Sequence, residues 1–181
     1  DFPAVCSAST CTSPRATVPS AYSAHLLARY AIQTPTTSLH DHNEARKTPV
    51  VVSRLLAGES VALVTDAGTP TISDPGVGLV RAAVAAGVRV EPVPGPSAAV
   101  SLLSVSGFPC DTFTFLGFPP PKAHDRRVWV EALAKERRPV VFYEAPHRIR
   151  ETLLEALSKL GDCQIVVGRE LTKLHEEVLR G

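Results

Sequence analysis

Two apolar runs, each followed by a turn and a helical pattern, constrain the fold of this chain more than any other feature. Residues 61–65 (VALVT) and 88–93 (VRVEPV) have the composition of short buried strands. Residues 76–87 and 97–107 have the apolar spacing of helices, and each segment ends in a glycine. Repeated strand, turn and helix units are typical of a parallel sheet covered by helices. The sequence therefore predicts an α/β fold with a mostly parallel sheet in this part of the chain.

The other segments predict further elements on both sides of these units. Before these units we expect the end of a helix at 26–32, an extended piece at 34–40 and a helix at 43–59 that Pro49 interrupts. After them we expect a strand of a different sheet at 111–118 and a helix at 123–138. The last segments predict a strand, turn and helix at 139–161, and a strand, turn and the start of a helix at 163–181. A second, smaller α/β domain follows from this order.

The domain organisation is read from composition. A chain of 181 residues with 44% hydrophobic residues can bury the core of one domain or of a domain and a half. Residues 1–25 are rich in Ser, Thr, Ala and Pro without a regular period, so they predict a poorly ordered lead-in. We place a boundary near residues 109–112, which divides the rest into domains at 26–110 and 111–181.

Charge and cysteine content exclude several classes of protein. The 19 basic and 18 acidic residues give a formal charge of +1, so any nucleic-acid surface has to be local. The four cysteines lack metal-ligand spacing and predict free thiols in a reducing cytosol, with no metal site. No run approaches the roughly 18 apolar residues of a membrane span, and no signal peptide is evident, so we expect a cytoplasmic protein without membrane contact.

The turn after the first apolar run carries the strongest site signal. Residues 65–76 (TDAGTPTISDPG) contain two aspartates, two glycines and two prolines, at the carboxyl end of a strand, where ligands bind in open α/β sheets. Asp66 can accept hydrogen bonds from an ammonium or a ribose hydroxyl and would repel a phosphate, and Gly68 lets a ligand approach the main chain. The alternative is that these residues only form the turn and cap backbone groups.

A second turn, residues 94–98 (PGPSA), follows the next expected strand, with Ser97 as the N-cap of the helix after it. Carboxyl ends of neighbouring parallel strands meet at one sheet edge, so the two turns predict a mostly uncharged cleft for a small molecule. The chain has no GxGxxG, GxxxxGK[ST], HExxH or GxSxG motif. Dinucleotide, P-loop, zincin and hydrolase sites therefore lack their defining residues.

Charged residues also follow the strands expected in the second half, in FYEAPHR (142–148) and GRELTKLHEE (168–177). Singly, each of these side chains fits a solvated or capping role. Together, one group could form a local basic wall for a phosphate backbone: Arg126, Arg127, Arg148, Arg169 and Lys173.

Three blocks in their order resemble a known family. The blocks are residues 61–122 (VALVTDAGTPTISDPG to FLGFPPPK), VVFYEAPHRIRETLLEAL and GRELTKLHEE, and LHDHNEA at 39–45 is similar to the family's HEHNE segment. They resemble the bacterial 16S ribosomal RNA cytidine 2'-O-methyltransferases, a branch of the tetrapyrrole methylase superfamily, over about Leu26 to Gly181.

The resemblance implies a homodimeric two-domain methyltransferase that binds S-adenosylmethionine and methylates a cytidine ribose in 16S ribosomal RNA of the small subunit. It implies cofactor contacts from one set of residues: Asp66, Ala67, Gly68, Thr69, Ile72, Asp74, Pro94, Gly95, Pro96, Ser97 and Ala98. A 2'-hydroxyl needs a proton acceptor or an orienting partner, and the candidates are Glu144, His147 and Lys122. The five basic residues above would then hold RNA phosphates.

The chain also departs from the family. The strand with a TPIGN loop that opens the family, the AEDTRHTRKLL-like segment and the closing strands are not found, so we expect a chain shortened at both ends and without its first strand. Two alternatives stay open: a relative that methylates a small tetrapyrrole-like metabolite, and a non-catalytic fragment that at most binds or dimerises.

Overall fold

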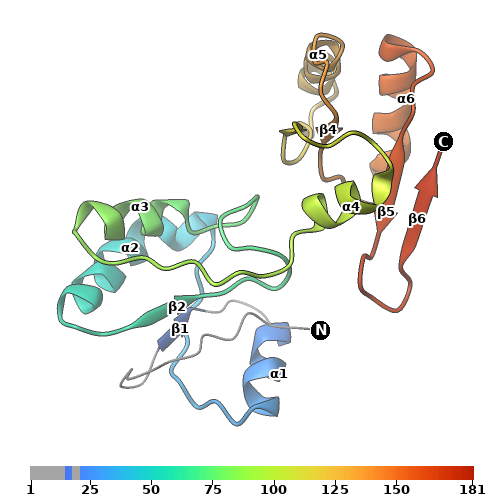
Figure 1. Cartoon of the computed structure of the whole chain (residues 1–181). Helices are drawn as coiled ribbons and strands as arrows, with labels where there is room; N and C mark the ends of the chain where they lie inside the picture. Colours follow the sequence, from blue (N-terminus) through green and yellow to red (C-terminus); the bar gives the residue numbers. More distant parts are fainter. Residues whose placement is uncertain (1–14, 18–20) are drawn as a thin grey trace. The chain divides into compact units, whose positions relative to one another are not determined.

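The computed structural model describes residues 15–17 and 21–181, and the chain divides into two compact units, Asp1–Pro96 and Ser97–Gly181 (Figure 1). We expected the division near residues 109–112. It lies earlier because the helix α4 (Ala98–Ser106) packs within the second unit, where its buried Ala99 and Leu103 form a core cluster with Val141. Among the described residues, no helix is long and apolar enough to cross a membrane.

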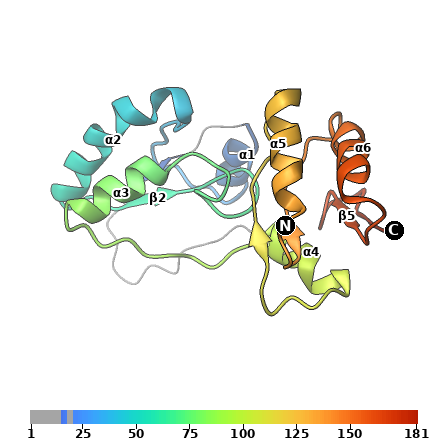
Figure 2. The same ribbon diagram turned by 90° about the horizontal axis from the view of Figure 1, so that it is seen from above.

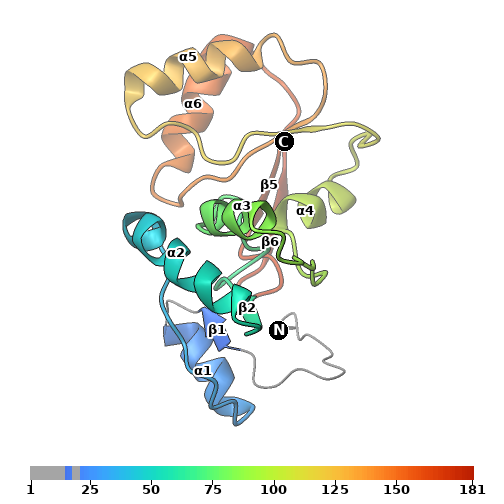
Figure 3. The ribbon, with the colours of Figure 1, turned by 90° about the vertical axis from the view of Figure 1, so that its left-hand side faces the viewer.

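The first unit is a small layered α/β structure. Its elements are β1 (Arg15–Thr17), α1 (Ala21–Arg29), α2 (Asp41–Leu56), β2 (Val61–Leu63) and α3 (Val77–Ala85). The strands β1 and β2 pair in parallel, and Figures 1 and 3 show α2 and α3 on one side of this pair and α1 on the other. The core lies between the helices and β2, where Leu39, Val51 and Leu79 are buried.

The strand β1 corrects the expectation that residues 1–25 form no element. Arg15 to Thr17 pair in register with Val61 to Leu63, and α1 begins at Ala21. A three-residue strand has no measurable period, so only its pairing with the apolar run at 61–63 identifies it. The other parts of the expected lead-in, residues 1–14 and 18–20, lie outside the described residues.

The helix α2 begins two residues before the expected start and continues through Pro49. A proline inside a helix removes one backbone hydrogen bond and usually bends the helix. Here Val51, two residues after Pro49, is 3% exposed and holds the second half of the helix in the core with Leu39 and Leu79. Tertiary packing therefore outweighs the local penalty of the proline.

The strand expected at 88–93 does not form, and residues 88–97 carry no helix or strand. Prolines at 92, 94 and 96 each lack the backbone N–H that a ladder needs, so this alternating run cannot pair along one edge. Val90 and Val93 are 45% and 42% exposed, which is more than a buried strand would allow. The helix before this segment, α3, and the helix after it, α4, both match the expectation.

The second unit contains α4 and two separate pairs of strands. Its further elements are β3 (Thr114–Phe115), α5 (Ala123–Leu133), β4 (Val140–Val141), α6 (Ile149–Leu160), β5 (Val166–Arg169) and β6 (Glu177–Arg180). The strands β3 and β4 pair in parallel, as a sheet distinct from that of the first unit. The helices α5 and α6 lie side by side (Figure 2).

The chain ends in an antiparallel hairpin, β5 with β6, where we expected a strand followed by a helix. The turn between them contains Glu170 and Thr172 in the left-handed region, at φ 47° and 67°. These two residues reverse the chain after Arg169, so that Glu177 can pair with it and Val178 with Gly168. Strand pairing therefore outweighs the helical spacing of apolar residues at 173–179.

Candidate functional site

The turn that follows β2 is open to solvent at its tip and fixed at its base. Asp66, Ala67 and Gly68 are exposed, and Ile72 is 46% exposed. At the base of the turn the Thr65 hydroxyl donates to Oδ2 of Asp74 at 3.0 Å, which joins two residues nine positions apart. Asp74 therefore shapes the turn, whereas Asp66 lies where a ligand can reach it.

The same turn is joined to the proline-rich segment expected to form the other wall of the site. The Thr69 hydroxyl donates to the carbonyl oxygen of Pro96 at 3.0 Å. A Cβ added to Gly68 would lie 4.0 Å from that same oxygen, and Gly68 has φ +78°. Sequence reasoning placed residues 66–74 and 94–96 on two separate turns of the first unit. These two segments meet through Thr69, although the strand expected at 88–93 does not form.

Backbone strain accumulates in this turn. Thr71 and Ser73 have φ of 70° and 61°, in the left-handed region that β-branched and most other side chains avoid. Gly76 has φ +124°, and a Cβ there would lie 2.7 Å from the Leu63 side chain. Strained residues of this kind persist only where the surroundings fix them, and they gather at ligand sites and switches.

The last two expected cofactor contacts belong to the second unit. Ser97 is the N-cap of α4, and its hydroxyl accepts from the Val100 N–H at 3.5 Å, as the sequence predicts. Ala98 is exposed in the first turn of that helix. Pro94, Gly95 and Pro96 stay exposed in the first unit.

In the second unit, a buried carboxylate organises the strand-end turn at 142–148. The Glu144 side chain is 1% exposed and accepts from the Thr152 hydroxyl at 2.6 Å and from the Ala145 N–H at 2.8 Å. Thr152 is itself fully buried. Both carboxylate oxygens are thus engaged inside the protein, and Glu144 fits a structural role better than that of a proton acceptor.

Arg148 connects this turn to the proline-rich loop before α5. Its Nη2 donates to the carbonyl oxygens of Pro119 and Pro120 at 3.0 and 3.1 Å, and its Nε lies 3.4 Å from Oε1 of Glu144. The contacts span 28 and 29 residues of chain, so Arg148 ties two of the motif blocks together. Lys122, two residues beyond Pro120, is exposed, and so is His147.

The basic residues expected to hold RNA do not share one environment. Arg126 is 2% exposed and makes ion pairs with Glu155 at 2.7 Å and Glu151 at 2.6 Å, both on α6. Hydrogen bonding to Glu155 raises the pKa of the Arg126 guanidinium, and the same bond lowers the pKa of the Glu155 carboxyl. Arg126 therefore fastens α5 to α6 and does not offer its charge to a ligand.

Three of the other basic residues reach solvent at separate places. Arg127 is exposed on α5, while Arg169 and Lys173 are exposed on the β5–β6 hairpin, whose turn lies at the end away from α5 (Figure 1). Arg169 is 62% exposed and has Glu177 at 3.9 Å across the hairpin. The structure thus does not gather all five residues into one wall.

Two residues that organise these turns escaped sequence reasoning. Thr152 has no motif of its own, and only its contact with Glu144 reveals it. Glu44 lies in the LHDHNEA segment, and its carboxylate accepts from the Gly76 and Leu79 N–H groups at 3.3 and 3.0 Å, at the end of the β2 turn. The resemblance of that segment to HEHNE marked Glu44 as part of a family motif, but it did not indicate what Glu44 does.

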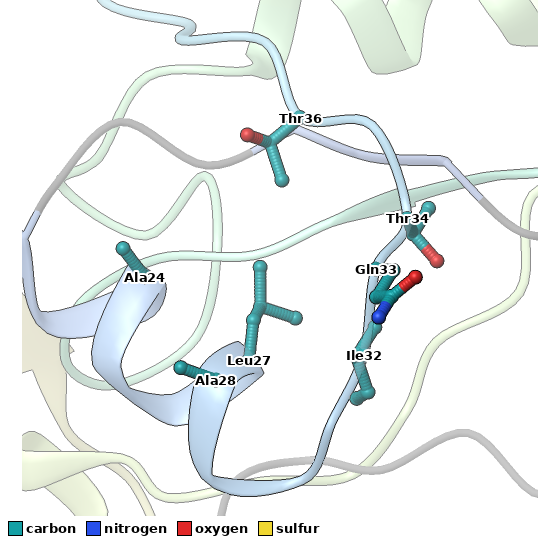
Figure 4. Close-up of a pocket in the computed structure, with 7 residues that line it drawn as sticks. All are labelled: Ala24, Leu27, Ala28, Ile32, Gln33, Thr34 and Thr36. Carbon is teal, nitrogen blue, oxygen red and sulfur yellow. The ribbon is translucent and has the colours of Figure 1, made fainter.

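A shallow hollow lies beside α1 in the first unit (Figure 4). It measures about 300 Å³. The described residues that line it are Ala24, Leu27, Ala28, Ile32, Gln33, Thr34 and Thr36. None of these side chains is titratable, so the hollow offers shape and weak polarity and no acid or base. Within residues 15–17 and 21–181, no group of three or more His, Cys, Asp or Glu could hold a metal ion.

Comparison with curated proteins gives relatives that share one name. The chain is 55% identical over 157 residues to the ribosomal RNA small subunit methyltransferase I of Xylella fastidiosa (strain Temecula1 / ATCC 700964), covering 86% of this chain and 58% of that protein. It is 51% identical over 154 residues to the protein of that name from Vibrio cholerae, covering 84% and 54%. The chain thus spans a little over half the length of these relatives.

A solved structure shares the fold. The crystal structure of the methyltransferase CobJ matches with a TM-score of 0.67 at 16% sequence identity, over 93% of this chain and 75% of that one. The family described as Tetrapyrrole (Corrin/Porphyrin) Methylases matches residues 5–181, which extends the resemblance upstream of Leu26, where we expected it to begin. Since this match runs through both units, the chain belongs to the tetrapyrrole (corrin/porphyrin) methylase family.

Proposed function

We propose that this chain takes part in S-adenosylmethionine-dependent 2'-O-methylation of a cytidine in the RNA of the small ribosomal subunit. The observation that carries the proposal is the 55% identity, over 86% of the chain, to a protein named ribosomal RNA small subunit methyltransferase I. The bridged pair of turns in the first unit supports it, because it provides a place for the methyl donor.

The β2 turn fits S-adenosylmethionine by its chemistry. Residues 66–76 contain no Lys or Arg, so they suit a ligand with an ammonium, a ribose and a sulfonium and without phosphate. Asp66 would receive hydrogen bonds from the ammonium or ribose, and the exposed main chain at Gly68 and Pro94 to Pro96 would line the rest. When bound, the donor supplies an electrophilic methyl group.

The second unit would present the RNA. Arg127, Arg169 and Lys173 are exposed and can contact phosphates, each at its own place on the unit. The 2'-hydroxyl must lose its proton as it attacks, and a positioned base assists this. His147 is exposed next to Arg148 and is the proposed acceptor, with Lys122 as an orienting group, because the oxygens of Glu144 are already engaged.

Two measurements on the purified chain test the proposal. Calorimetric titration with S-adenosylmethionine should show binding that Asp66→Ala weakens, while the exposed Glu91→Gln in the same unit leaves it unchanged. Radiolabelled methyl transfer should occur to small ribosomal subunits, and nuclease digestion should release 2'-O-methylcytidine. Transfer to a tetrapyrrole and not to RNA would support the metabolite alternative, and absence of both binding and transfer would support a non-catalytic role.

A further inference from the structure

The helix α3 begins at the end of the β2 turn without a cap from its own sequence. Its N-cap is Gly76, which has no side chain to accept the free N–H groups of the first turn. Helices normally satisfy these groups with a local Ser, Thr, Asp or Asn. The cap of α3 comes instead from α2, through the carboxylate of Glu44.

Glu44 reaches this position from 32 residues upstream. Its Oε2 accepts from the Gly76 N–H at 3.3 Å, and its Oε1 accepts from the Leu79 N–H at 3.0 Å. The negative charge also complements the positive end of the helix dipole. Figure 1 shows α2 and α3 lying against one another, so the carboxylate bridges two packed helices.

The surrounding sequence leaves room for this carboxylate. A Cβ at Gly78 would lie 2.7 Å from Oε1 of Glu44, so a larger residue there would displace the cap. The α2 side of the bridge is fixed as well. Asn43, next to Glu44, is 7% exposed, and its Oδ1 accepts from the His40 N–H at 2.9 Å at the start of α2.

Glu44 is therefore one of the attachments that hold the strained turn. The Thr65 to Asp74 bond closes its base, the Thr69 to Pro96 bond joins it to the proline segment, and Glu44 holds its final residue, Gly76. Between these attachments lie the residues with unfavourable φ. Their conformation is maintained by the contacts around them, as strained backbone requires.

We propose that Glu44 is a positioning residue, which holds the 66–76 turn in the conformation that receives the cofactor. The inference rests on the proposed function of that turn, since Glu44 itself would not touch the ligand. Its role is to pre-order the turn, so that less conformational freedom is lost on binding.

The first test needs no ligand. Backbone amide hydrogen exchange should be measured for wild type, Glu44→Ala, Glu44→Gln and Arg54→Ala. Arg54 is the matched control, because it lies on the same helix and pairs with Glu59 at 2.8 Å, away from the turn. Glu44→Ala should accelerate exchange across residues 66–79 about tenfold, whereas Arg54→Ala should not change it there. Acceleration confined to residues 77–80 would make Glu44 a helix cap only and would overturn the proposal.

The second test measures affinity. Glu44→Ala should weaken S-adenosylmethionine binding about tenfold, and Glu44→Gln, which keeps one acceptor oxygen, should recover most of it. Equal affinity of Glu44→Ala and wild type would refute the positioning role. If wild type binds no cofactor, the proposed function fails, while the exchange result still decides whether Glu44 orders the turn. If Glu44→Ala does not fold, Glu44→Gln should show intermediate acceleration, and its absence would count against the role.

Discussion

The hydroxyl of Thr69 donates a hydrogen bond to the carbonyl oxygen of Pro96, 27 residues away, at 3.0 Å. This bond joins the turn after β2 to a segment that has no strand of its own to hold it. Prolines at 94 and 96 keep that segment extended by fixing φ, and Thr69 sets where it lies. Two turns expected on neighbouring strands are thus brought together by a side chain.

Removal of the Thr69 hydroxyl should loosen the proposed cofactor site. Thr69→Val keeps the shape and loses the donor, and we expect S-adenosylmethionine affinity to fall about fivefold, since a single hydrogen bond contributes about 1 kcal/mol. Thr69→Ser, which keeps the donor, should bind within twofold of wild type. Calorimetric titration measures both variants. Equal affinities for Val and Ser would mean that the bond to Pro96 does not shape the site.

Local patterns predicted the elements whose signals are local. The helices α3 and α4 appear where apolar spacing and terminal glycines placed them, and Ser97 caps α4 as expected. The turn at 66–76, exposed at its tip, also begins within three residues of its strand, as the run VALVT followed by DAG predicts. In these cases the residues that determine the structure lie within a few positions of one another.

The features that sequence reasoning missed depend on partners far along the chain. The strand β1 is defined by pairing with β2, and β6 by pairing with β5. The burial of Arg126 follows from glutamates 25 and 29 residues later on α6, which no local spacing on α5 reveals. From local sequence alone, a basic residue in a charged helix is therefore predicted to face solvent, and only the opposing helix shows that it is buried.

Arg126 should be among the most important residues for the stability of the second unit. Its loss in Arg126→Ala leaves Glu155 and Glu151 without their partner, and breaking a buried ion pair in this way costs about 3 kcal/mol. Urea unfolding of the chain measures the change. The control is Lys159→Ala, which breaks an exposed ion pair with Glu131 between the same two helices and should change the unfolding midpoint little. Comparable losses in the two variants would contradict a special role for the buried pair.

The same pair predicts a pH dependence of stability. The hydrogen bond from Arg126 lowers the pKa of Glu155 below its ordinary value of 4.5, so the folded state favours the carboxylate. This contribution is fully present above pH 4.5 and is lost as the pH falls through the lowered pKa. The stability difference between wild type and Glu155→Gln should therefore shrink in acid. In an Arg126→Met background the difference should vary much less with pH, and an unchanged profile there would assign the effect elsewhere.

Arg148 should govern methyl transfer more than cofactor binding. Its guanidinium holds the carbonyl oxygens of Pro119 and Pro120, and so fixes the loop that leads to Lys122. Arg148→Ala frees that loop, and we expect transfer to small ribosomal subunits to fall at least tenfold, on the proposed function, because misplacement of reacting groups by about 1 Å can lower rates about a hundredfold. Affinity for S-adenosylmethionine should stay within twofold of wild type.

Arg150→Ala is the matched control, since Arg150 is exposed in the first turn of α6, two residues after Arg148, and carries the same charge. It should reduce transfer much less than Arg148→Ala. If the two variants lose transfer equally, the effect is one of charge toward RNA and not of loop position. Arg148→Lys separates the two readings further, because it keeps the charge but cannot hold both carbonyl oxygens in the geometry of a guanidinium. It should therefore resemble Arg148→Ala, and full activity in Arg148→Lys would refute the role of the loop.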